Sequence, residues 1–357
     1  MTIIGAGIVG LALAWELAGK RDVLVIERHE NFGQETSSRN SEIIHSGIYY
    51  PRDSLKTKLC IKGKELIYAL CQKYGLPYKK LGKLVVSLTK EDTEEIENLY
   101  LRGKENGVQD ILLLDHKGIK RYEPDIRGVR AVYSPSAGIV DTHSLMKFFE
   151  TKAKERGALF AYGHHLKEIE KLTGQYKVTM TDPSGRFISV LSAVLINSAG
   201  LEADKVSDMA GREGYHLYYC KGEYFRVTGY PHTLRHLIYP PPTDLSLGIH
   251  TILDLKGGLK IGPDAEYVDK IDYRVSPWKR EAFYAAVKDY LRGLRISHLT
   301  EDMAGIRPKI QKRGEGIKDF IIKEESEEGF PGLVNLIGIE SPGLTASPAI
   351  AGYVREI

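Results

Sequence analysis

The first 27 residues follow a pattern of apolar segments and glycines that is typical of a nucleotide-binding unit. Residues 3–26 read as an apolar strand, a glycine turn, an apolar helix and a second apolar strand. In such units the glycines allow a tight turn and close approach of the backbone to a pyrophosphate, and an acid after the second strand binds a ribose hydroxyl. A purely structural glycine turn is the alternative. The pattern favours a dinucleotide site at Gly5, Gly7, Gly10 and Glu27.

The rest of the chain contains helices and strands of several kinds. Apolar residues return with helical spacing over 55–74, an alternating strand pattern covers 83–89, and a charged surface helix is predicted over 91–106. Further on, we expect a helix over 276–294 and a loop over 303–308. Helices and strands therefore alternate along the chain, which indicates a mixed α/β protein.

A second strand–turn–helix unit lies far from the first. Residues 193–197 form an apolar strand whose pattern indicates burial on both faces, and they lead into Ser198, Ala199 and Gly200 before another helix. Residues 215–227 and 237–261 are rich in β-formers, with glycine and proline between them, which suggests an antiparallel sheet. We therefore predict a Rossmann-like nucleotide-binding domain built from discontinuous segments, and a substrate domain with a mainly antiparallel sheet. The predicted bounds are 1–80, 138–213 and 300–357 for the first domain, and 81–137 and 214–299 for the second.

Composition narrows the classes of function. The formal net charge of +3 over 357 residues is too small for a nucleic-acid binder. The three cysteines, Cys60, Cys71 and Cys220, are odd in number and have no CxxC spacing, so we expect no disulfide framework, no metal site and a reducing compartment. No apolar run approaches the length of a membrane-spanning helix. We expect a cytoplasmic protein, and peripheral contact with a membrane stays open.

Two polar segments follow the nucleotide unit and are candidates for ligand contact. Small hydroxyl residues and glycine let backbone and side-chain donors approach a ligand closely. A solvated serine-rich loop is the alternative, but the position directly after the nucleotide unit favours contact. The residues concerned are Ser37, Ser38, Arg39, Asn40, His45, Ser46 and Gly47.

Short motifs along nearly the whole chain carry a resemblance to a known family. They are Thr36–Ser41, Ile44–Tyr50, Lys58–Cys60, Gly82–Leu84, Gly138–Asp141, Gly248–His250, Ile261–Pro263 and Ala304–Arg307. Together with the N-terminal glycines, they resemble the L-2-hydroxyglutarate dehydrogenase/oxidase family. That family belongs to the D-amino-acid-oxidase-like FAD-dependent oxidoreductases, beside flavin glycerol-3-phosphate dehydrogenases and glycine or sarcosine oxidases. The N-terminal motifs are shared across this superfamily, whereas the later ones point to the hydroxyglutarate branch.

The resemblance implies that the dinucleotide is FAD. It implies that the N-terminal glycines hold the pyrophosphate, Glu27 and Arg28 lie at the adenosine, and Leu166 touches the adenine through its backbone. It further implies contacts to the cofactor from Ser37, Ser38, Arg39, Asn40, His45, Ser46, Gly47, Ser198, Ala199, Gly200, Arg307, Gly343, Leu344 and Thr345. A cysteinyl link to the flavin is not expected, because no cysteine lies near the C-terminal flavin loop. A histidyl link at His45 stays open.

Two positions depart from the family pattern. Residues 340–343 read Glu-Ser-Pro-Gly where the family tends to read Asn-Ala-Pro-Ser, and Lys221 stands where we expect arginine. Lysine keeps the positive charge but loses the bidentate geometry of a guanidinium. These departures leave the identity of the substrate more open than the type of reaction.

Oxidation of a 2-hydroxy acid needs a base for the hydroxyl proton and cations for the carboxylates. Histidine suits the base because its usual pKa lies near 6.5, and the candidates are His45 and His250. Either could instead be a buried structural histidine, and the sequence does not say which is the base. Arg307, after a glycine, is the candidate carboxylate anchor. Lys221 is a candidate anchor for a distal carboxylate, and Tyr239 a candidate hydrogen-bond donor.

The predicted function is FAD-dependent oxidation of L-2-hydroxyglutarate to 2-oxoglutarate by hydride transfer. One alternative is oxidation of glycerol 3-phosphate or of an amino acid, as in other branches of the superfamily. A second alternative is a non-enzymatic flavin subunit that passes electrons to a partner. The electron acceptor (oxygen, a quinone or a protein) and the oligomeric state are not predicted by the sequence.

Overall fold

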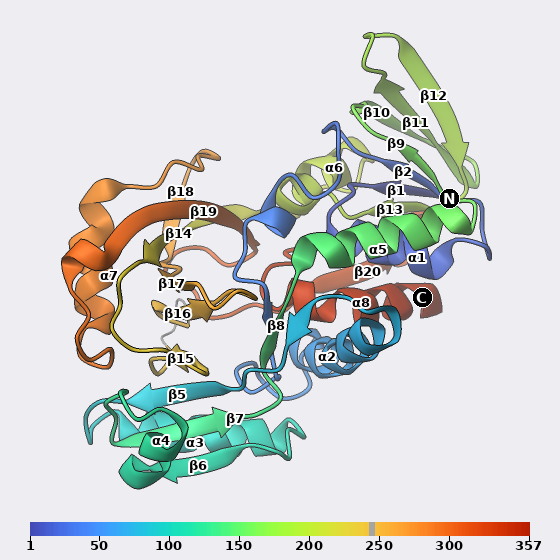
Figure 1. The fold of residues 1–357 in the computed structure, drawn as a ribbon. Helices are drawn as coiled ribbons and strands as arrows, with labels where there is room; N and C mark the ends of the chain where they lie inside the picture. Colours follow the sequence, from blue (N-terminus) through green and yellow to red (C-terminus); the bar gives the residue numbers. More distant parts are fainter. Residues whose placement is uncertain (243–246) are drawn as a thin grey trace.

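The computed structural model describes residues 1–242 and 247–357. Its central sheet has the strand order β20-β21-β13-β1-β2-β9, and every neighbouring pair is parallel except β20 with β21. The strands are β1 (Thr2–Ile4), β2 (Leu24–Ile26), β9 (Leu159–Ala161), β13 (Leu195–Asn197), β20 (Ile321–Glu325) and β21 (Phe330–Ile337). Strands far apart in the sequence therefore form one sheet, as predicted for a nucleotide-binding unit built from discontinuous pieces (Figure 1).

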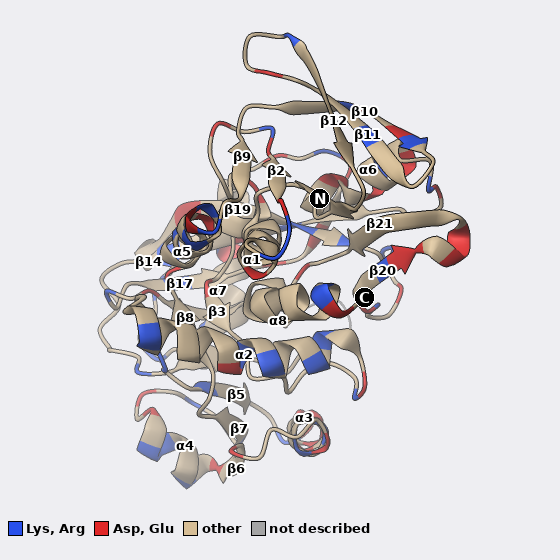
Figure 2. Ribbon diagram, turned by 90° about the vertical axis from the view of Figure 1, so that its right-hand side faces the viewer, with Lys and Arg blue, Asp and Glu red and all other residues tan. Residues whose placement is uncertain are grey.

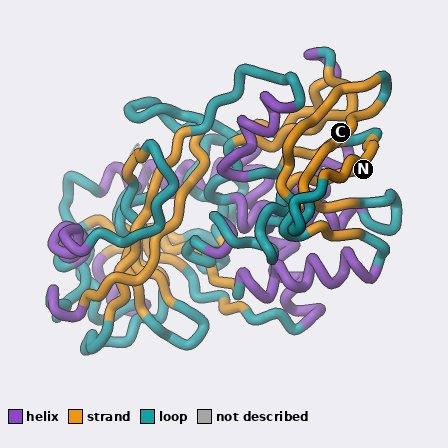
Figure 3. Tube along the Cα trace, turned by 90° about the horizontal axis from the view of Figure 1, so that it is seen from above, coloured by secondary structure: helices purple, strands orange, loops and turns teal. Residues whose placement is uncertain are grey.

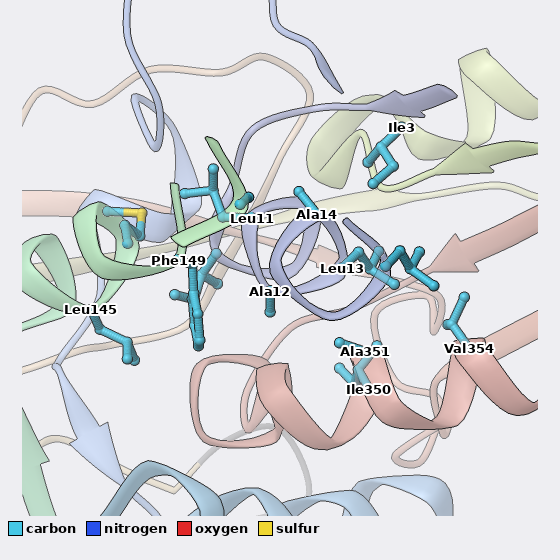
Figure 4. Packing of buried hydrophobic residues seen from close by; sticks show 14 of the residues in the cluster. Ile3, Leu11, Ala12, Leu13, Ala14, Leu145, Phe149, Ile350, Ala351 and Val354 are labelled. Carbon is cyan, nitrogen blue, oxygen red and sulfur yellow. The ribbon is translucent and has the colours of Figure 1, made fainter. Parts of the chain in front are cut away.

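Helices cover one face of this sheet, and a small antiparallel sheet covers the other. The helices are α1 (Ile8–Leu17), α2 (Leu55–Tyr74), α5 (Thr142–Glu155) and α8 (Gly343–Glu356). Apolar side chains of α1, α5 and α8 meet in one core (Figure 4). On the other face lie α6 (Ala203–Met209), β10 (His165–Leu172), β11 (Gln175–Thr181) and β12 (Phe187–Ser192). Because both faces are covered, the central strands are apolar without alternation.

A second region carries two further sheets and its own core. One sheet joins β14 (Tyr218–Val227), β16 (His250–Leu253), β17 (Leu259–Gly262), β18 (Glu266–Val268) and β19 (Leu299–Lys309). The other joins β5 (Lys83–Ser87), β6 (Leu112–Asp115), β7 (Arg130–Ser134) and β15 (Leu237–Tyr239). The helices here are α3 (Thr93–Glu105), α4 (His116–Tyr122) and α7 (Arg280–Val287). Seen from above, both chain ends lie in the nucleotide-binding region, on the side away from these sheets (Figure 3).

A three-stranded sheet connects the two regions. It consists of β3 (Ile43–Ile44), β4 (Tyr78–Lys79) and β8 (Gly138–Val140). The α/β class predicted from the sequence is confirmed. The proposed domain bounds remain a prediction, and β19, which lies within the predicted first domain, pairs with β14 of the predicted second domain.

Two predicted elements differ from the structure. Residues 303–308 are not a loop but part of β19, because pairing with β14 outweighs the low strand propensity of Gly305 and Pro308. The predicted helix over 276–294 is regular only over the short helical turn Pro277–Lys279 and α7.

The exposed helices carry charges of both signs. Acidic and basic residues lie side by side on α3 and α5 (Figure 2), in keeping with the small net charge. Within the part of the chain that the structure describes, no helix combines the length and the apolar character needed to span a bilayer.

Candidate active site

A cavity of about 1080 Å³ is lined by residues from both regions. This volume lies at the upper end of the roughly 300–1,000 Å³ that is typical of ligand and cofactor sites. Its wall runs from the turn before α1, through the loop around residue 39, to β16, β19 and the start of α8. Most of the residues predicted to bind the nucleotide and most of those predicted to act on the substrate therefore line one cavity.

The glycine turn before α1 is closely packed. Gly5 has a φ of +98°, and a Cβ there would lie 2.7 Å from the carbonyl oxygen of Ser198. A Cβ on Gly10 would lie 2.0 Å from the carbonyl oxygen of Gly5. The turn therefore excludes side chains at both positions, and Gly5 and Gly7 line the cavity at the N-terminus of α1. Gly10 lies behind them and supports the turn.

Glu27, the acid after β2, lies in the cavity wall. Glu27 Oε2 accepts a hydrogen bond from the backbone N–H of Ala6 at 2.8 Å, and its Oε1 accepts one from His29 at 2.9 Å. These bonds fix the carboxylate at the cavity wall and leave lone pairs for ligand hydroxyls. Arg28 lines the same wall but pairs with Glu35 and Glu202.

Some residues of the predicted serine-rich loop line the cavity, whereas others form hydrogen bonds that stabilise the loop. Ser37 Oγ accepts a hydrogen bond from the N–H of Ile8 at 2.9 Å, at the N-terminus of α1. Arg39 lies 4.0 Å over the ring of Tyr273, and its buried Nε has no hydrogen-bond partner within the described residues. Ser38 does not line the cavity, since its hydroxyl donates to a backbone carbonyl of the loop.

Other predicted cofactor residues follow the same division. The cavity wall includes Asn40, Leu166, Ser198, Ala199, Gly200, Gly343 and Leu344. Ser46, Gly47 and Thr345 do not belong to it. Thr345 instead fixes the start of α8 against β3, because its Oγ1 accepts from the N–H of His45 at 3.0 Å and donates to the carbonyl of Ile43 at 3.1 Å.

The two candidate histidines lie at the cavity wall with different partners. His45 Nδ1 lies 3.5 Å from Lys83 Nζ, and its Nε2 lies 3.2 Å from Ser341 Oγ. His250 Nδ1 donates to the carbonyl of Gly248 at 2.8 Å, so its Nε2 carries the lone pair in the neutral ring. That Nε2 is buried and has no partner within the described residues. The His250 ring stacks on Tyr239, with ring centroids 3.7 Å apart.

Burial and nearby positive charge keep both histidines neutral. Burial lowers the pKa of His45 well below its usual value, and the charge of Lys83 adds to the effect. Burial also lowers the pKa of His250 to about 3, aided by Lys83 and Arg307 and opposed by the hydrogen bond to Gly248. Two neutral imidazoles therefore line the wall.

Arg307 lines the cavity from β19 and keeps part of its hydrogen-bonding capacity free. Its Nη2 donates to the carbonyl of Asp264 at 3.1 Å, and its Nη1 contacts Cys220 Sγ at 3.7 Å. No carboxylate within residues 1–242 and 247–357 forms an ion pair with it. A guanidinium has five N–H donors, so donors remain for a carboxylate ligand.

Lys221 does not line the cavity, contrary to the role predicted for it. Its Nζ lies 3.0 Å from Glu223 Oε1 and also donates to the carbonyl of Arg274. Lys221 and Glu223 are two residues apart in β14 and so share one face of the strand. That spacing in the sequence could have indicated the pair.

Sequence reasoning missed a buried charge cluster in the cavity wall. Glu340 accepts hydrogen bonds from Lys56 Nζ at 3.0 Å and Lys309 Nζ at 3.1 Å. Although burial alone would raise it, these two lysines hold the pKa of Glu340 at about 2. The cluster joins residues more than 250 positions apart, so no local pattern reveals it. It places the positive charges of Lys56 and Lys309 in the same wall as Arg307, and the single carboxylate of Glu340 offsets one of the two.

Comparison with known proteins identifies the family. The family model described as FAD dependent oxidoreductase matches residues 1–357. The chain belongs to this FAD dependent oxidoreductase family. It is 36% identical to a mitochondrial L-2-hydroxyglutarate dehydrogenase of Arabidopsis thaliana, over 99% of this chain and 82% of that protein. It is 30% identical to an L-2-hydroxyglutarate dehydrogenase of Indibacter alkaliphilus, over 99% of this chain and 97% of that one.

A solved structure of an FAD-bound oxidase has a similar fold. The L-alpha-glycerophosphate oxidase of Mycoplasma pneumoniae, solved with FAD bound, superposes with a TM-score of 0.89 at 27% identity, over 99% of this chain and 93% of that chain. The cofactor of this oxidoreductase family is FAD, and the cavity fits it. Gly5 and Gly7 line the cavity at the N-terminus of α1, a site suited to a pyrophosphate, and Glu27 keeps lone pairs for ligand hydroxyls. The Nε of Arg39, which has no hydrogen-bond partner among the described residues, can donate to an anion.

Proposed function

We propose that this FAD-dependent oxidoreductase converts L-2-hydroxyglutarate to 2-oxoglutarate. The observation that carries the proposal is that one cavity contains a guanidinium without an ion-pair partner, and an imidazole nitrogen without a hydrogen-bond partner, among the described residues. Arg307 offers free donors to a carboxylate, and His250 Nε2 offers a lone pair to a hydroxyl. The identities with the two L-2-hydroxyglutarate dehydrogenases support the choice of substrate.

Oxidation of the substrate alcohol removes a hydride from C2 and a proton from its hydroxyl. Bound FAD supplies the hydride acceptor. Arg307 holds the C1 carboxylate, and His250 Nε2 accepts the hydroxyl proton. The hydrogen bond from Nδ1 to Gly248 fixes the tautomer in which Nε2 is free for this. Burial is the main cause of the low pKa of His250; a bound carboxylate offsets only the smaller contribution of the Lys83 and Arg307 charges, which favours proton acceptance.

His45 has a supporting role in this proposal. Its imidazole bridges Lys83 and Ser341, and its backbone N–H donates to Thr345. An ammonium can only donate, so a charged Lys83 leaves the ring proton on His45 Nε2. His45 is then a hydrogen-bond donor at the cavity wall, and the proton-accepting position belongs to His250.

The test is anaerobic reduction of the bound flavin by candidate substrates. L-2-hydroxyglutarate should bleach the oxidised flavin absorbance, and the D isomer should not. Glycerol 3-phosphate is the second candidate, because Lys56 and Lys309 lie in the same wall as Arg307 and because of the likeness to the glycerophosphate oxidase. Bleaching by glycerol 3-phosphate alone would overturn the proposal. The cytoplasmic location stays a prediction, and the electron acceptor is left open.

A further inference from the structure

Two buried tyrosine hydroxyls lie in the cavity wall that also contains the two candidate histidines. The hydroxyl oxygens of Tyr49 and Tyr239 are buried and form no hydrogen bond with any described residue. Both tyrosines line the cavity, beside His45 and His250. Buried polar groups in native proteins are nearly always hydrogen-bonded. Two orphaned hydroxyls in one cavity wall therefore indicate a polar ligand.

Lys83 is not itself among the residues that line the cavity, but it places a positive charge directly behind the two tyrosines. Its side chain is fully buried, and its one hydrogen bond within residues 1–242 and 247–357 goes to His45 Nδ1. Its Nζ lies 3.9 Å from the ring centroid of Tyr239 and 5.1 Å from that of Tyr49. The pairing of β5 with β15 aligns Lys83 with Leu237 and holds it there. No described carboxylate pairs with it.

A buried charge without a partner costs free energy, because it has lost its hydration. Two aromatic faces offset only part of that cost. The arrangement becomes favourable when an anion is present, since donors and cation are then both satisfied. The two hydroxyls and the ammonium are therefore matched to an anionic group on the ligand.

We propose that Tyr49, Tyr239 and Lys83 form the subsite for the second carboxylate of a dicarboxylic 2-hydroxy acid. The inference rests on the proposed function and deepens it. The tyrosine hydroxyls donate to the distal carboxylate, and Lys83 supplies the charge from behind the rings. Arg307 binds the carboxylate next to the reacting carbon. His250, Arg307 and the two tyrosines all line the same cavity, so the proton acceptor shares that space with both carboxylate-binding groups.

The subsite has a specific pH dependence. Burial lowers the pKa of Lys83 to about 7, whereas burial raises the pKa of Cys60 to about 12 and those of Tyr49 and Tyr239 well above 10. The two histidines that face Lys83 are already neutral above about pH 6. Of the described titratable groups that face this subsite, Lys83 is therefore the one that loses its charge as the pH rises from 6 to about 9. The second carboxylate should bind more tightly at the acidic end of this range.

The experiment compares two non-reacting acids of five carbons by calorimetry on the FAD-loaded enzyme. Glutarate carries two carboxylates and pentanoate carries one. The variants are K83M, Y49F and Y239F, with K117M as control, because Lys117 is an exposed lysine of α4 in the same region. Each substitution at the subsite keeps most of the side-chain volume, and thermal unfolding reports whether the variant folds.

The subsite predicts an effect that depends on the ligand. In K83M the Kd of glutarate should rise about 10- to 100-fold, as expected when a partly buried charge pair is lost, while the Kd of pentanoate changes less than about threefold. Y49F and Y239F should weaken glutarate by about tenfold each, since each loses one hydrogen bond to a charged group. From pH 6 to 9, glutarate binding should weaken about tenfold in the wild type and stay constant in K83M.

Equal changes for both acids in K83M would overturn the subsite, as would an effect on glycerol 3-phosphate with none on glutarate. K117M should bind both acids like the wild type. The proposed function fails separately: if L-2-hydroxyglutarate does not reduce the wild-type flavin, the glutarate-to-pentanoate ratio still tests the subsite.

Discussion

Replacement of Arg307 by methionine tests the carboxylate anchor. The guanidinium has five N–H donors, and the structure engages two of its nitrogens, one with a carbonyl at 3.1 Å and one with a thiol at 3.7 Å. The remaining donors are enough for a bidentate pair with a carboxylate. Truncation of one partner in such an enclosed charge pair costs about 2–4 kcal/mol. At about 1.4 kcal/mol per tenfold, kcat/KM should fall about 30- to 1,000-fold.

The same structure predicts what R307M leaves unchanged. Because Arg307 has no ion-pair partner within the described residues, its removal strands no buried anion, so thermal stability should stay near that of the wild type. R307K should recover part of the lost kcat/KM, since lysine keeps the positive charge but not the bidentate geometry of a guanidinium. The matched control is R226A, which removes an exposed arginine of β14 that pairs with Asp302.

The assay is stopped-flow reduction of the flavin under anaerobic conditions, at several substrate concentrations. The flavin content of each variant is measured first. R226A should behave like the wild type. If R307M keeps wild-type kcat and KM while retaining its FAD, Arg307 does not bind the substrate and the reasoning is refuted.

Three further predictions follow from the cavity wall. H250F should slow flavin reduction about 10²- to 10⁴-fold with FAD retained, the usual contribution of a general base; a wild-type rate would exclude His250 from that role. G10A should purify with little flavin, because its Cβ would lie 2.0 Å from the carbonyl oxygen of Gly5, and a normal ratio of flavin to protein absorbance would contradict this. E340Q should cost about 3–5 kcal/mol in denaturant unfolding at pH 7, because it leaves two buried lysines without an anion. The low pKa of Glu340 contributes stability above about pH 4.5 that is lost as the pH falls toward 2, so the difference between wild type and E340Q should shrink at pH 3.

The nucleotide end of the cavity was predictable because its signal is local. Glycine spacing, a following helix and an acid after the second strand lie within 27 residues, and each has a steric or hydrogen-bonding reason. The turn at Ser198 was recognisable for the same reason, as a short apolar strand followed by small residues. The sequence does not predict which of these side chains line the cavity and which form hydrogen bonds within the loop instead.

The substrate end was harder, because its geometry depends on contacts between distant strands. Lys83 begins a strand that reads as half-exposed from its sequence, but β15 and the cavity wall bury every residue of it. Lys221 is an exception, because its pairing with Glu223 two positions along the same strand could have been predicted from the spacing. The strand that carries Arg307 was predicted as a loop, because Gly305 and Pro308 have low strand propensity and the pairing with β14 is not apparent from the sequence.

The central claim is best tested by anaerobic flavin reduction with a panel of substrates. The account predicts that L-2-hydroxyglutarate fully bleaches the oxidised flavin and yields one equivalent of 2-oxoglutarate per flavin, while D-2-hydroxyglutarate, glycerol 3-phosphate and glycine leave the spectrum unchanged. Bleaching by glycerol 3-phosphate or glycine, with none by L-2-hydroxyglutarate, would contradict it.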